Sequence, residues 1–446
     1  MQHGSDLVAA YPAYRRWRVQ IFAITWLAYV GFYLTRKSFS VAKIGIQDDP
    51  VLQMTDREMA LVDGAYLIAY AVGQFMFGMA GDRAGTRRVI VIGMLVSVIA
   101  AVAMGASTLT IAFGVFFCIQ GLAQSTGWGP LVKNMSAFFS RRERGTVMGL
   151  WSTNYPLGGL IASIIAGWAG DHFGWRYAFF IPAIALLVVW ILFLLFQRNQ
   201  PEDVGLPAVE QYHGEPLPVL EPGAAPVVET QGSWETIRTV LTNRMVLLFA
   251  AVYFLLKPAR YAILFWGPKY MNDRLGSGMT ESAALSAMFE LAGPIGALSA
   301  GVLSDRLFGT RRVPVCVVGL LLLGGMLFTY DHLPANRLAL GGGFFLIGFL
   351  LFGPDSLIAS TAAVDFGTKR GASTASGVVN GCGSIGAIVG GTIPGFFNER
   401  WGWGGVFALM GSMAILAALL LLPRWNALPP VAAKQASPGD PEPLTR

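Results

Sequence analysis

The stretch GMAGDRAGTRR, residues 78–88, decides the fold because it returns in nearly the same form as GVLSDRLFGTRR, residues 301–312. The second copy contains one extra residue. Two shorter matches continue the series in the same order along the chain: Arg144-Gly145 with Arg370-Gly371, and Gly174-Trp175 with Gly402-Trp403. Ordered matches whose spacing increases only slowly indicate that the chain consists of two homologous halves.

Long apolar runs occupy most of the chain between these markers. Of its 446 residues, 54% are hydrophobic and 13% are charged, whereas about 25% are charged in a typical soluble domain. The runs are continuous and rich in Gly, Ala and Leu, which favours membrane-spanning helices over the alternating strands of a barrel. We therefore predict an all-α membrane protein with twelve transmembrane helices in two pseudo-symmetric six-helix bundles. The spans are expected to begin near residues 19, 59, 89, 109, 145, 175, 245, 280, 313, 338, 371 and 403.

A stretch rich in Pro and Glu, which is typical of a solvated linker, divides the chain near its midpoint. The predicted parts are an N-terminal bundle (1–196), a cytoplasmic linker (197–243), a C-terminal bundle (244–424) and a disordered cytoplasmic tail (425–446).

Loop charge predicts the orientation. The loops expected inside hold fourteen Lys and Arg residues, and the alternate loops hold seven, Lys43 among them. The positive-inside rule then places both termini in the cytoplasm, and we expect a multi-pass protein of a bacterial inner membrane. The same distribution accounts for the net charge of +6 without nucleic-acid binding.

The repeated charged loop resembles the signature loop of the major facilitator superfamily. Asp82 can pair with Arg83 or with a neighbouring helix end, and Asp305 and Arg306 are the counterparts in the second half. The resemblance implies two halves that rock about a central site, with these residues forming a cytoplasmic latch that breaks during the movement. Simple anchoring by positive charge is the alternative, although it requires neither the Asp nor the Gly residues.

Two arginines lie inside apolar spans at equivalent positions of the halves. Arg36 is in the first span and Arg260 in the seventh, and their spacing matches that of the flanking repeat markers. A pseudo-two-fold axis would make them face each other across one cavity. An arginine at a helix centre costs about 2.5–3.5 kcal/mol on insertion scales, so a matched pair indicates a bound anion. Guanidinium forks bind phosphate oxygens through two parallel hydrogen bonds. The alternative is that both side chains extend toward the outer interface.

Over nearly its whole length the chain is similar to the organophosphate:phosphate antiporter family. The resemblance implies that Arg36 and Arg260 bind phosphate and that a phosphorylated sugar or polyol is exchanged for inorganic phosphate. Two positions depart from the family pattern, because Gln74 replaces a Lys and Tyr155 replaces a His. These changes remove a cation and a group that titrates near neutral pH, so substrate identity and proton coupling stay open. The segments that carry the resemblance are YRRWRVQIF from Tyr14, YLTRKSF from Tyr33, QSTGWGPLVK from Gln124, PEDVGLP after the sixth span, RYAILFWGPKY from Arg260 and FELAGPIG from Phe289.

Two lysines accompany the arginines. Lys37 adjoins Arg36 in the sequence, and Lys257 lies three residues before Arg260, on the same helical face. Lys257 could replace the cation that is missing at Gln74, or it could pair only with an acidic neighbour.

Glu290 and Asp355 are the acids deepest in apolar spans. Each could release a cation when substrate arrives, carry a proton, or form a fixed structural ion pair. Tyr33 lies one turn before Arg36, where its hydroxyl could reach phosphate or sugar oxygens.

Several function classes find no support in the sequence. The four His residues lie outside the spans, no Cys spacing suggests zinc, and neither an ATP-binding G-x-x-x-x-G-K-[ST] loop nor a nucleophile-base set is present. We predict a monomeric transporter, not an enzyme, with no metal or cofactor; its partners are a phosphorylated anion, inorganic phosphate and the lipid bilayer. A membrane sensor of hexose phosphate and a proton-coupled carrier of carboxylates are the two rival interpretations.

Overall fold

The computed structural model describes residues 2–139, 144–209, 238, 241–308, 311–362 and 372–427. The described elements follow the order of the twelve predicted spans, and the all-α fold is confirmed. The N-terminal half contains α1 (Gln2–Arg36), α2 (Ser38–Gln47), α3 (Asp56–Ala84), α4 (Thr86–Ala106), α5 (Thr110–Gln124), α6 (Trp128–Phe138), α7 (Arg144–Trp151), α8 (Asn154–Phe173) and α9 (Tyr177–Phe196). The C-terminal half contains α12 (Arg244–Leu275), α13 (Met279–Leu307), α14 (Arg312–Tyr330), α15 (Arg337–Ser356), the π-helix η2 (Leu357–Ala362) and α17 (Ala372–Leu421).

The last two spans run together as α17, which bends sharply at Gly402. This residue has φ 64°, and its counterpart Gly174, between α8 and α9, has φ 94°. Residues with a Cβ rarely adopt this backbone region, whereas glycine enters it without penalty. The repeated Gly-Trp pair therefore marks the same turn in both halves.

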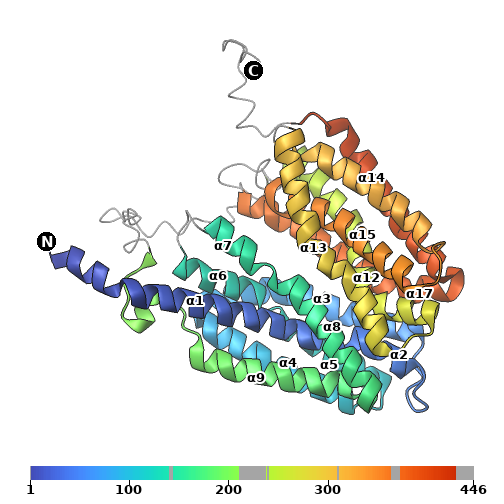
Figure 1. The fold of residues 1–446 in the computed structure, drawn as a ribbon, viewed down its shortest axis with the longest axis horizontal. Helices are drawn as coiled ribbons and strands as arrows, with labels where there is room; N and C mark the ends of the chain where they lie inside the picture. Colours follow the sequence, from blue (N-terminus) through green and yellow to red (C-terminus); the bar gives the residue numbers. More distant parts are fainter. Residues whose placement is uncertain are drawn as a thin grey trace, which may run out of the picture.

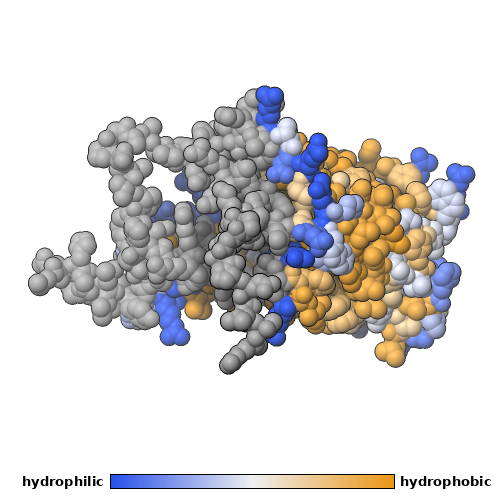
Figure 2. Space-filling model, turned by 90° about the horizontal axis from the view of Figure 1, so that it is seen from above, coloured by the Kyte–Doolittle hydropathy of each residue, from blue (hydrophilic) through white to orange (hydrophobic). Residues whose placement is uncertain are grey.

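The surface between the helix ends is apolar. Large aliphatic side chains such as Ile92, Ile111, Leu298 and Leu338 are exposed, and Figure 2 shows an apolar band bordered on both sides by hydrophilic residues. Among the described residues, seven helices are long and apolar enough to cross a membrane. Because all backbone groups of a helix bond internally, such a surface is suited to lipid.

The two halves meet at one end of the molecule. In Figure 1 the bundles converge near α2 and α12 and diverge toward the ends where α1 begins and α13 finishes. We call the end that carries residues 48–55, 174–176 and 276–278 the hairpin face, and the end that carries residues 197–209 the terminal face.

The start of the predicted linker is packed on the terminal face. The short 3-10 helix η1 (Pro201–Val204) follows α9, and Leu206 and Val209 pack on Tyr14 and Trp17 of α1. Most of the remaining linker, and the tail beyond residue 427, lie outside the described residues.

Candidate functional site

A proline in the C-terminal part of α12 frees a backbone carbonyl for contact with the other half. Pro268 has no N–H, so the carbonyl of Leu264, four residues earlier, has no helical donor. That oxygen accepts hydrogen bonds from Lys37 Nζ at 2.9 Å and Ser40 Oγ at 3.1 Å. The two donors lie three residues apart and so share one helical face. This contact joins the first and seventh spans.

Arg36 ends α1 directly beside this contact, and its side chain is buried. Its Nε donates to Gln124 Oε1 at 2.9 Å, and the Tyr66 hydroxyl donates to the same oxygen at 2.8 Å. Its guanidinium carbon lies 4.5 Å from the ring centroid of Tyr33 and 4.9 Å from that of Tyr70. Arg36 Nη2 is buried without a hydrogen-bond partner. With 5% of its area exposed, Arg36 does not extend toward the interface, so that alternative is wrong for this residue.

Arg260 lies in α12 and is held by a carboxylate. Its Nη1 is 3.0 Å from Asp355 Oδ2, and Lys257 Nζ is 3.1 Å from Asp355 Oδ1. One acid of α15 therefore bridges both cations of α12. The ring centroids of Tyr155 and Phe352 lie 5.4 Å and 4.8 Å from the Arg260 guanidinium carbon.

Residues of α8 connect the surroundings of the two arginines. The Tyr155 ring lies against Arg260, and three residues further along α8 the backbone of Gly158 lies against Tyr33, whose ring contacts Arg36. The next residue, Gly159, lies against Glu290. The structure thus brings the predicted pair into one polar cluster between the bundles.

Glu290 crosses between the halves. It lies 3.5 Å from Lys37 Nζ, and both side chains are at most 5% exposed. A Cβ on Gly159 of α8 would collide with a Glu290 carboxylate oxygen, so the glycine provides the space for this carboxylate. Removal of either charge would leave the other buried without its ion-pair partner.

The other predicted site residues are placed as follows. Gln74 is exposed on α3, one turn beyond Tyr70, so it lies on the same face as a residue that contacts Arg36. Arg306 is exposed. The side chains of Asp82, Arg83 and Asp305 lie outside the described residues. Within the part of the chain that is described, no three His, Cys, Asp or Glu side chains gather as metal ligands.

Lys43 and Asp63 form a third buried ion-pair site, which was not predicted from the sequence. Lys43 belongs to α2 and not to a loop, and both side chains are fully buried. Its Nζ also donates to the Phe265 carbonyl at 3.0 Å and lies 3.7 Å from the Trp266 ring centroid. The pair therefore holds α2 and α3 against α12.

We expect Lys43→Met alone, or Asp63→Asn alone, to lower the stability of the protein by about 3–5 kcal/mol, because the remaining polar group stays buried without its partner. The double variant should recover most of the loss. Thermal unfolding of the purified protein in detergent would measure this, and a double variant no more stable than Lys43→Met would contradict an energetic coupling of the pair.

Among the contacts that join the halves at the hairpin face, two are related by the pseudo-symmetry. Asp171, at the end of α8, accepts hydrogen bonds from the backbone N–H groups of Met279 at 2.8 Å and Thr280 at 2.7 Å, at the start of α13. Glu399 of α17 accepts one from the N–H of Arg57 at 3.3 Å, at the start of α3. Each acid lies three residues before the glycine of the repeated Gly-Trp pair, so the two occupy equivalent positions of the halves.

These carboxylates act as helix N-caps that are supplied by the opposite half. Gly278 precedes α13 and offers no side-chain cap, whereas Thr55 caps α3 from within its own half. An oxygen acceptor at a helix N-terminus satisfies free N–H groups and favours the helix dipole. Asp171 is therefore the more important of the two caps.

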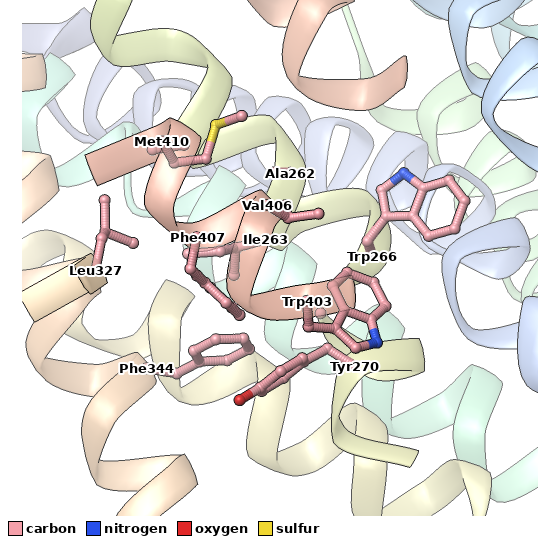
Figure 3. A pocket seen from close by; sticks show the side chains of 12 residues that line it. Ala262, Ile263, Trp266, Tyr270, Leu327, Phe344, Trp403, Val406, Phe407 and Met410 are labelled. Atoms are coloured by element: carbon pink, nitrogen blue, oxygen red, sulfur yellow. The ribbon is translucent and has the colours of Figure 1, made fainter. Parts of the chain in front are cut away.

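A small void in the C-terminal half is unsuited to a substrate. Figure 3 shows aromatic side chains around it, among them Trp266, Tyr270, Phe344 and Trp403. It provides about 10 Å³ of space, roughly enough for a single water molecule. The polar cluster around Arg36 and Arg260 is the stronger candidate.

Comparisons with known proteins identify the family of this chain. The family profile described as Major Facilitator Superfamily matches residues 25–391. The chain is 34% identical to the membrane sensor protein UhpC of Escherichia coli, over 94% of each chain. It is 31% identical to a probable hexose phosphate transport protein of Chlamydia muridarum, covering 95% of this chain and 94% of that one. It is 32% identical to the glycerol-3-phosphate transporter of Bacillus subtilis, covering 93% and 94%.

A solved structure supports the fold. A bacterial homologue of the human lysosomal transporter Spinster, in an inward-facing and unoccupied conformation, matches with a TM-score of 0.70 at 14% identity, over 92% of this chain and 96% of that one. The chain belongs to the major facilitator superfamily and, within it, to the organophosphate:phosphate antiporter family. It is a multi-pass membrane protein of a transporter family and not an enzyme.

Proposed function

We propose that this protein exchanges a phosphorylated organic anion, of the sugar phosphate or glycerol phosphate type, for inorganic phosphate by alternating access. The observation that carries the proposal is the balance of charge between the halves. Four cations and two carboxylates meet there, which leaves an excess of two positive charges. They are Arg36, Lys37, Lys257 and Arg260, with Glu290 and Asp355.

A doubly charged phosphoryl group would match this excess. The unpartnered Nη2 of Arg36 offers a donor to a phosphate oxygen. Tyr33, whose ring lies against the Arg36 guanidinium, would add a hydroxyl donor. Gln74 and Tyr155 would contact the remainder of the substrate, in place of the Lys and His of the family pattern.

Exchange follows from the cost of moving uncompensated charge. When the halves rock without a ligand, two net positive charges must be carried through a site of low dielectric constant. A bound dianion removes this cost, and any phosphoryl group does so equally well. Return of inorganic phosphate through the same site is the expected second half of the cycle.

The membrane orientation is part of the proposal. The distribution of Lys and Arg supports both termini in the cytoplasm of a bacterial inner membrane, with a monomer as the working unit. The terminal face would then be cytoplasmic. The Asp82–Arg83 loop and its counterpart at Asp305 and Arg306 would form the latch there that alternates with the hairpin-face contacts.

Counterflow in proteoliposomes tests the exchange. Vesicles that contain the purified protein and unlabelled phosphate should take up labelled phosphate, and external glucose 6-phosphate or glycerol 3-phosphate should inhibit uptake. Empty vesicles should take up far less. Equal uptake by loaded and empty vesicles would contradict obligatory exchange.

A sensor function is the second candidate, because the relative with 34% identity is named a membrane sensor protein. A sensor would bind hexose phosphate and yet move no labelled phosphate in the same vesicles. Binding of glucose 6-phosphate measured by calorimetry, together with absent counterflow, would favour this candidate.

A further inference from the structure

The two arginines of the site differ in their electrostatic state, although they occupy equivalent positions. Arg260 lies 3.0 Å from a carboxylate oxygen of Asp355. Among the described residues Arg36 has no carboxylate within ion-pair distance; its Nε bonds to the neutral Gln124 and its Nη2 has no hydrogen-bond partner. Arg36 thus keeps a buried donor without a partner, whereas the Arg260 guanidinium already binds a carboxylate.

Asp355 is positioned to stay paired with Arg260 until a ligand binds. Its Oδ2 accepts a hydrogen bond from Arg260 Nη1 at 3.0 Å, its Oδ1 lies at ion-pair distance, 3.1 Å, from Lys257 Nζ, and its side chain is 7% exposed. Lys257 lies one helical turn before Arg260, so it can retain the carboxylate when Arg260 turns toward a ligand. Lys257 thereby remains an ion-pair partner for Asp355 after Arg260 has moved, so the buried carboxylate is not left unpaired.

A ligand that uses both arginines has to compete with Asp355 for Arg260. A monovalent anion brings one charge, the same as the carboxylate, and gains little by replacing it. A dianion can place one charge at Arg36 and still offer a second at Arg260. The balance of charge therefore favours divalent ligands, and the competing carboxylate strengthens this preference.

We propose that Asp355 is a specificity-determining residue that selects divalent over monovalent oxyanions by competing for Arg260, with Lys257 as its alternative partner. The inference rests on the proposed function, since it concerns anion binding at the same site. It assigns to Asp355 a role in selection beyond that of a fixed structural acid.

The test uses two tetrahedral oxyanions that differ by one charge, sulfate and methanesulfonate. Each competes against labelled phosphate for binding to the purified full-length protein. We expect the wild type to prefer sulfate by about tenfold or more, and Lys257→Met/Asp355→Asn to reduce this preference to about threefold or less. The double variant keeps the net charge of the site, so a change in selectivity cannot come from total charge.

A second double variant distinguishes a change in anion selectivity from the general effect of losing a buried ion pair. Lys43→Met/Asp63→Asn removes a Lys–Asp pair that contacts neither arginine and should keep the preference of the wild type. Asp355→Glu retains the charge and should keep the preference as well, which supplies a second variant if the double variant folds poorly. Phosphate itself should bind the wild type more weakly at about pH 5, where it is mostly a monoanion, than at about pH 8.

The outcomes separate the two proposals. A wild type that prefers sulfate, with a double variant that keeps this preference unchanged, would overturn the role of Asp355 and leave the proposed function intact. A wild type that binds neither phosphate nor sulfate would overturn both.

Discussion

Arg36→Lys and Arg260→Lys should each reduce phosphate exchange by about 100-fold or more, if the two guanidinium groups hold the phosphoryl group together. Lysine keeps the charge and loses the planar fork, and charge-assisted hydrogen bonds contribute about 1.5–3 kcal/mol each. Losing the two parallel bonds of one fork thus accounts for a reduction of this order. Initial rates of phosphate counterflow in proteoliposomes measure the effect.

The two substitutions should differ in how strongly they weaken phosphate binding. Arg36→Lys removes the fork that has no acidic partner, whereas Arg260→Lys leaves Asp355 with two lysines. We therefore expect the weaker phosphate binding in Arg36→Lys. Arg337→Lys supplies the control, because Arg337 lies 76% exposed beside Glu281 and should retain exchange. Counterflow at the wild-type rate in Arg36→Lys or in Arg260→Lys would contradict the proposed site.

Removing both caps of the hairpin face, in Asp171→Ala/Glu399→Ala, should shift the protein toward the conformation in which this face is open. The caps join the halves only in the closed state, so their loss destabilises that state alone. Substitution of an N-cap by Ala costs about 0.5–2 kcal/mol, and a change of 1.4 kcal/mol is about tenfold in population. Asp171→Ala alone should account for most of the shift, since α13 has no side-chain cap of its own.

A cysteine at Ala283 reports the opening. Ala283 is fully buried in the apolar cluster that joins α2, α3 and α12, so a maleimide should label it only when the halves separate there. The background carries serine in place of Cys118, Cys316 and Cys382. We expect the labelling rate to rise about tenfold in the double variant.

Two controls assign this effect to the caps. Asp171→Asn/Glu399→Gln keeps an oxygen acceptor at each helix start and should restore slow labelling, because Asn caps about as well as Asp. Asp49→Ala removes an acid of the same face that bonds Trp175 within its own half, and it should leave the rate unchanged. An unaltered rate in Asp171→Ala/Glu399→Ala would show that the remaining contacts across this face, which include Asn398 and Lys269 with Asp56, keep it closed.

The sequence pointed to both central arginines, and it specified the partners of the acids less completely. A charged residue in an apolar run is visible without a structure, and the spacing of the repeats relates Arg36 to Arg260. The pattern could not tell which cation each acid meets, because Asp355 and Lys257 belong to separate helices, α15 and α12, that are far apart along the chain. Lys43 was misassigned to a loop because the groups that accommodate its buried charge, Asp63 and the backbone and ring of α12 residues, are distant from it in the sequence.

The sequence by itself determined the membrane-spanning fold, the two homologous halves and the pairing of equivalent positions. Periodic apolar runs and repeated loops are local signals, so they can be read along the chain. Only the tertiary structure decided which arginine is paired with a carboxylate and which has a buried donor without a partner. It also showed that Asp171 and Glu399 cap helices of the opposite half. Such contacts form between helices that are distant in the sequence. The identity of a residue does not specify which side chain of another helix it will contact.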